Sequence, residues 1–188
     1  MDLASWLVAE HDDAVHRLTK QILALVPAER RRERMPGANS VDWTTFHVAR
    51  HAALALRVVG HETVMSDSLI AGFNPAVTAP SAGLQEVEQP WLTLIETPEL
   101  EAYALSVLDE VRAFLTHSDA ASLAVDAATN TPAALRAAGL DEVEFDWLYE
   151  QWSTPNTLLR WPLTGHITHH VGELTGVRNQ LGLSPFRS

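Results

Sequence analysis

Residues 165–174 read Gly165-His166-Ile167-Thr168-His169-His170-Val171-Gly172-Glu173-Leu174. If this segment is helical, His166 and His170 lie one turn apart, about 40° around the axis, so both imidazoles can point at one site. Glu173 falls on the same face, about 20° from His166, whereas His169 lies about 60° away from it. This spacing is typical of two metal ligands carried by one helix.

A second pair of histidines occurs in the segment Ser40-Val41-Asp42-Trp43-Thr44-Thr45-Phe46-His47-Val48-Ala49-Arg50-His51. His47 shares one helical stripe with Trp43, Leu54 and Val58, so its imidazole is expected on the apolar side of its helix. A buried imidazole needs either a hydrogen-bonding partner or a metal ion. Taken alone, each pair of histidines is more typical of a hydrogen-bonded core. Two such pairs on different helices fit a metal site as well as they fit a core.

The rest of the chain follows a helical period, and alternation typical of strands is scarce. Ser40 and Gly60 are suited to cap the second helix, and Thr97 followed by Pro98 predicts the start of the third. Residues 61–96 and 118–156 read as long irregular connections, with short helices expected around 132–138 and 142–152. We therefore expect one all-α domain over 1–188, a four-helix bundle whose long helices span 3–26, 40–59, 97–117 and 157–182, the last kinked or begun at Pro162.

Composition excludes several classes of protein. The chain has no cysteine, which rules out disulfides and thiolate ligands, and its net charge of −11 disfavours nucleic acid as a partner. The one basic run, at Arg30, Arg31, Arg32 and Arg34, is interrupted by acids and is interpreted as a solvated loop. Neither a signal peptide nor a membrane span is visible, so a cytoplasmic protein without a membrane partner is expected.

The two histidine segments resemble the second and last helices of the DinB-like superfamily, which includes mycothiol-dependent maleylpyruvate isomerase-like metalloproteins. There a serine precedes a histidine by seven positions, as Ser40 precedes His47. The last helix there carries His-x-x-x-His, then x-Gly-Gln or x-Gly-Glu, an arginine and a glycine, which residues 166–173, Arg178 and Gly182 match. Residues 99–115 fit the third helix, and the likeness is weakest over 61–96 and 118–156.

The resemblance implies a bundle that binds one divalent metal ion through His47, His166 and His170. Glu173 stands where the family more often has glutamine, and it would orient one of the ligands. His51 is either an alternative ligand or a residue of the helix–helix packing. His169 is expected at the mouth of the pocket. A site of histidines alone suits zinc or nickel best.

By the same resemblance, the leading hypothesis is a thiol-dependent transferase or isomerase, in which the metal activates a low-molecular-weight thiol toward a small electrophile. Mycothiol is favoured among such thiols because one lysine beside twelve arginines is typical of GC-rich genomes. The alternatives are a metal-assisted hydrolase, with Glu173 or Glu150 as general base, and a non-catalytic bundle stapled by its metal, with a stress-related or partner-binding role. A homodimer is left open. The tryptophans form either the core or the wall of an apolar pocket: Trp43, Trp91, Trp147, Trp152 and Trp161.

Overall fold

The computed structural model describes residues 2–61, 63–73, 90–119 and 127–186 of the chain. None of these residues lies in a strand, so the predicted all-α class is confirmed. The helical elements are α1 (Leu3–Arg17), η1 (Leu18–Leu23), η2 (Ala28–Arg30), α2 (Val41–Val58), α3 (Val64–Ile70), η3 (Pro90–Leu94), α5 (Thr97–His117), α7 (Ala127–Ala137), α8 (Asp146–Gln151), α9 (Pro155–Arg160), η4 (Trp161–Gly165) and α10 (His166–Gln180).

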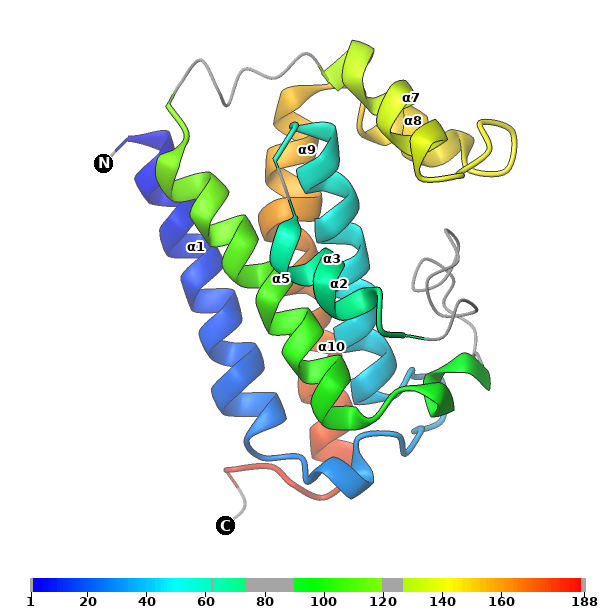
Figure 1. Cartoon of the computed structure of the whole chain (residues 1–188). Coiled ribbons are helices and arrows are strands. Elements are labelled where there is room, and N and C mark those ends of the chain that lie inside the picture. Colours follow the sequence, from blue (N-terminus) through cyan, green and yellow to red (C-terminus); the bar gives the residue numbers. More distant parts are fainter. Residues whose placement is uncertain (1, 62, 74–89, 120–126, 187–188) are drawn as a thin grey trace.

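Four long helices, α1, α2, α5 and α10, run side by side, and α7 and α8 lie at one end of them (Figure 1). Helix α2 is the central element: it contacts α5, α7, α10 and η4. Every residue of α2 except Arg57 is buried. The buried surface of α2 is therefore wider than the single apolar stripe expected from the sequence, because neighbouring helices cover the alanine-rich sides of α2 as well.

The ends of α2 follow local chemistry. The Ser40 hydroxyl accepts a hydrogen bond from the Trp43 backbone N–H (3.1 Å), which satisfies one of the free donors of the first turn. Gly60 adopts a φ of 72° just after the helix, a conformation that favours glycine. Both predicted caps are confirmed.

Thr97 does not cap α5 as the sequence predicts. The helix begins at Thr97 itself, and Glu96 precedes it without a capping hydrogen bond from its side chain. The Thr97 hydroxyl instead donates to the carboxylate of Asp42 (2.6 Å), which is buried at the start of α2. The Thr97 hydroxyl thus binds a residue distant in sequence and not the backbone of its own helix. This hydrogen bond joins the first turns of α2 and α5.

The basic run is not a solvated loop. Arg31 is buried, and its guanidinium donates to the carbonyls of Leu23 and Val26 and to the carboxylate of Glu101. Arg32 bonds Asp42 and the carbonyl of Ile95. The guanidinium groups of this run bind carbonyls at the end of η1 and acids on α2 and α5. The interpretation as a solvated loop was wrong because these partners are distant in sequence.

The last helical segment contains a π-helical turn, η4, between α9 and α10. Pro162 lacks an N–H and so cannot continue the α-helical ladder. The Thr164 hydroxyl donates to the carbonyls of Leu159 (2.9 Å) and Arg160 (3.0 Å). A Cβ on Gly165 would lie 2.6 Å from the Arg160 carbonyl oxygen, so this turn requires glycine. Because α9 precedes Pro162, this proline interrupts the helical segment and does not begin it. The regular helix resumes at His166.

The irregular connections are partly helical. Residues 61–96 contain α3 and η3, and residues 118–156 contain α7 and α8, near the short helices expected there. Parts of both connections, 74–89 and 120–126, lie outside the described residues. Among the helices that the structure describes, none is both long enough and apolar enough to cross a membrane.

His11 ties α1 to the rest of the molecule. Its buried ring donates from Nε2 to the Leu108 carbonyl on α5 (2.9 Å), and its Nδ1 lies 3.4 Å from the Leu163 carbonyl in η4. Burial lowers the pKa of His11, and the two carbonyls oppose this effect only in part. The ring is therefore neutral in the fold at a pH at which an unfolded chain, with a histidine pKa of about 6.5, takes up a proton.

This difference predicts an acid-sensitive fold. Below about pH 6.5 the unfolded state binds a proton that native His11 does not, so the free energy of unfolding falls as pH falls. With EDTA present, we expect His11→Gln to reduce this dependence by up to about 1.4 kcal/mol per pH unit, measured by urea unfolding between pH 7.5 and pH 5. The exposed His16→Gln on the same helix is the control, and an equal effect of both variants would contradict the assignment.

Candidate metal centre

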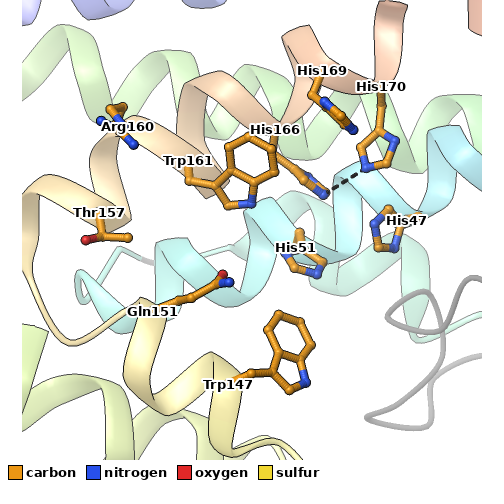
Figure 2. Close-up of a pocket in the computed structure, with 10 residues that line it drawn as sticks. All are labelled: His47, His51, Trp147, Gln151, Thr157, Arg160, Trp161, His166, His169 and His170. Atoms are coloured by element: carbon orange, nitrogen blue, oxygen red, sulfur yellow. Dashed lines mark hydrogen bonds between the residues drawn. The ribbon is translucent and has the colours of Figure 1, made fainter. Parts of the chain in front are cut away.

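Four histidine rings from two helices meet in the buried space between α2 and α10 (Figure 2). His47 and His51 come from α2, and His166 and His170 come from α10; all are buried. The ring centroid of His47 lies 4.9 Å from that of His51, 5.0 Å from that of His166 and 4.9 Å from that of His170. The structure thus brings the three predicted ligands, His47, His166 and His170, into contact.

His51 belongs to the same cluster. Ring nitrogens of His47, His51 and His166 all lie within 4.8 Å of one another, a spacing that suits the ligands of one metal ion. His170 joins through His166, since the Nε2 atoms of these two rings are 3.0 Å apart. Two candidate triads therefore share His47 and His166. The first is completed by His51, whose nitrogen meets the spacing, and the second by His170, whose ring contacts those of His47 and His166.

Glu173 holds one of these rings in place. The Nδ1–H of His170 donates to the Glu173 carboxylate at 2.6 Å, which leaves the Nε2 lone pair of His170 facing His166. The other carboxylate oxygen lies 3.1 Å from Nε2 of His169, which is exposed beside the cluster. Glu173 therefore fixes the tautomer of His170, as carboxylates do for histidines that ligate metals. His169, Glu173 and the buried His170 also form a second group of potential metal ligands, in which His169 and Glu173 are exposed.

The buried rings carry uncompensated nitrogens. Within the described residues, Nδ1 of His51 and Nδ1 of His166 are buried without a hydrogen-bonding partner. Burial, and then the neighbouring histidines, lower the pKa of both His51 and His166. Both rings are thus neutral and keep a lone pair, which is the form that binds metal. Uncompensated polar atoms in a core are costly, and a cation bound by these lone pairs offsets that cost.

Two tryptophans fix the rings on α2. Trp43 stacks on His47, with centroids 4.9 Å apart and planes 11° from parallel. Trp152 is fully buried and meets the His51 ring edge to face at 5.7 Å. Of the two alternatives given for the tryptophans, core or pocket wall, Trp43 and Trp152 therefore follow the first: both belong to the core. The side chain of Trp91 lies outside the described residues.

A cavity of about 510 Å³ opens beside the histidines, and Trp147 and Trp161 belong to its wall (Figure 2). The described residues that line it are His47, His51, Trp147, Gln151, Thr157, Arg160, Trp161, His166, His169 and His170. Sequence reasoning missed Gln151, Thr157 and Arg160. Thr157 and Arg160 lie one turn apart on α9, but the π-helical turn after them changes the helix register. Their relation to the histidines therefore could not be calculated from the spacing alone.

Comparisons with protein-family models, with curated proteins and with solved structures find no match for this chain. The DinB-like resemblance stays a prediction, and functional arguments rest on the geometry of the site.

Single substitutions of the histidines distinguish the two triads. We expect His166→Ala to abolish tight zinc binding, because His166 belongs to both triads, and loss of one of three ligands costs orders of magnitude in affinity. His51→Ala and His170→Ala then separate the alternatives: the true ligand behaves as His166 does. Titration with a chromophoric zinc chelator measures the affinity. The exposed His16→Ala on α1 is the control, and stoichiometric tight zinc in His166→Ala would refute the site.

Glu173→Gln tests the carboxylate–histidine pair. The amide can still accept from Nδ1–H of His170, but it loses the negative charge that strengthens the hydrogen bond and the basicity of Nε2. We expect the affinity for zinc to fall about tenfold to a hundredfold, with helicity by circular dichroism unchanged. An unchanged affinity would mean that His170 needs no such support, which would favour the triad containing His51.

Proposed function

We propose that the chain is a divalent-metal-binding protein of the DinB-like type, a four-helix bundle that acts as a thiol-dependent transferase or isomerase. The observation that carries the proposal is the convergence of buried histidines from α2 and α10, whose donor atoms lie within 4.8 Å in one group. Zinc or nickel is the proposed ion, since neutral imidazole is a ligand that both accept.

A metal ion held by His47, His166 and either His51 or His170 would keep its positive charge and would lower the pKa of a thiol or water bound to it. The cavity beside the histidines supplies the space for such a molecule. In a transfer reaction the thiol sulfur forms a bond to the electrophilic carbon as the leaving group departs with the bonding electrons, and the thiol proton passes to solvent. The residues that line the cavity would bind and orient the reactants.

The lining of the cavity favours a thiol over water as the nucleophile. No Asp or Glu is among the described residues that line it. Glu173, one of the two bases considered for a hydrolase, is engaged by His169 and His170. Glu150, the other, is exposed on α8 and does not line the cavity. A thiol, with an ordinary pKa of about 8.5, ionises near neutral pH with much less help than water.

The test measures thiol consumption in the presence of chlorodinitrobenzene as a model electrophile. We expect zinc-loaded or nickel-loaded protein to consume mycothiol or bacillithiol, EDTA-treated protein to lose this activity, and added metal to restore it. His166→Ala is expected to lack activity, whereas the exposed Arg17→Gln is expected to keep it.

Two outcomes would favour the other functions. Metal-dependent hydrolysis of nitrophenyl acetate without a thiol, together with no thiol consumption, would support the hydrolase. A large fall in thermal stability on removal of the metal, with neither activity, would support a bundle that the metal merely staples.

A further inference from the structure

We propose that the cavity beside the histidines binds a planar apolar molecule that carries a carboxylate or similar anionic group, with the anion at Arg160. This inference rests on the proposed function, because such a molecule would be the electrophile that the thiol attacks. The cavity volume of about 510 Å³ lies within the range of small-molecule sites. Figure 2 shows its two ends, with the histidines at one and Thr157 and Arg160 at the other.

The middle of the cavity is aromatic. Trp161 lies between the histidines and Arg160, and Trp147 approaches from α8 on the opposite side of the cavity (Figure 2). The Trp161 ring meets the rings of His166 (5.5 Å) and His169 (5.6 Å), and the Trp147 ring stacks at 6.3 Å on His51.

The core does not cover these two tryptophan rings completely. Trp147 is 38% exposed, and Trp161 is half-buried, whereas Trp152 nearby is fully buried. Packing in the core therefore accounts for Trp152 but leaves apolar area of Trp147 and Trp161 facing the cavity. A planar apolar group placed between the two rings would cover this area and gain stacking contacts.

The far end of the cavity carries one cationic side chain, Arg160. Arg160 is exposed, and no carboxylate of the described residues lies within ion-pair distance of it. Other arginines in the described part of the chain do pair with acids: Arg17, Arg30, Arg31, Arg32, Arg57, Arg112 and Arg136. In a chain with a net charge of −11, a cation that faces a cavity without an acid beside it is suited to an anionic ligand.

Neighbouring polar groups complete this end. Thr157 lines the cavity one turn from Arg160 on α9, and Gln151 lines it from α8, with its amide toward the middle of the cavity (Figure 2). The hydroxyl and the amide can donate to oxygen atoms of a bound molecule. The arrangement therefore orients a ligand: the anion lies at Arg160, the apolar body lies between the tryptophans, and the opposite end of the molecule faces the histidines.

The test compares three probes by calorimetric titration of the full chain as purified, with its metal content measured. Naphthoate has both the planar ring and the charge, naphthylmethanol lacks the charge, and hexanoate lacks the ring. We expect naphthoate to bind about tenfold more tightly than naphthylmethanol, because a charge-assisted hydrogen bond contributes about that factor. Naphthoate is also expected to bind more tightly than hexanoate, which has the carboxylate but no ring to stack on the tryptophans. Arg160→Gln is expected to remove the preference for naphthoate over naphthylmethanol, and Arg160→Lys to retain part of it.

Two control variants make the result specific. Arg17→Gln removes the same charge from an exposed site on α1 and is expected to leave the preference unchanged. Trp147→Ala is expected to weaken naphthoate and naphthylmethanol alike, since both place the ring against the tryptophan. Equal binding of the two probes by the unaltered chain would overturn the proposal. A preference that survives Arg160→Gln would also overturn it, because the anion would then be held elsewhere, for instance on the metal.

The results distinguish a failure of the anion site from a failure of the proposed function. Absence of metal and of thiol consumption, with an intact Arg160-dependent preference, would refute the transferase but leave the anion site. Metal-dependent thiol transfer without that preference would refute only the anion site.

Discussion

The burial of four imidazole rings between α2 and α10 is the constraint on which the rest of the structure depends. His47, His51, His166 and His170 are all buried, although an imidazole loses hydrogen bonds to water when it enters a core. The loss is tolerable only where the rings meet one another, a carboxylate or a cation. Both helices must therefore keep one relative position, because rotation of either would leave polar nitrogens against apolar side chains.

The π-helical turn η4 sets the position of α10 within this constraint. Pro162 interrupts the hydrogen-bond ladder, the Thr164 hydroxyl donates to two carbonyls of the preceding turn, and Gly165 allows the close approach of the Arg160 carbonyl. The next residue is His166, so the rotation of the helix is fixed directly before the first ring of the cluster. His11 contacts a carbonyl of the same turn, which connects α1 to the placement of the site.

Features that depend on neighbours in sequence were predictable, and those that depend on distant partners were not. Ser40 and Gly60 mark the ends of α2 because capping is local, and the spacing of His166 and His170 fixes their common face. Thr97 departs from its expected role because Asp42, far away in sequence, takes its hydroxyl. The position of His51 in the cluster and the cavity at Arg160 likewise depend on how α2, α8 and α9 pack against α10. Local sequence patterns do not predict that packing.

The surroundings of the histidines differ from those of a closed structural site. A metal that only staples helices is best enclosed by protein ligands on all sides, because every remaining position is a route for water and for loss of the ion. Here the core closes the side of Trp43 and Trp152, while the side of Trp147 and Trp161 borders a cavity. A staple has no need of two partly exposed tryptophans at the cavity, nor of an arginine there that pairs with no acid among the described residues. They are expected in a site that admits a second molecule, which is the reason to place chemistry at this interface.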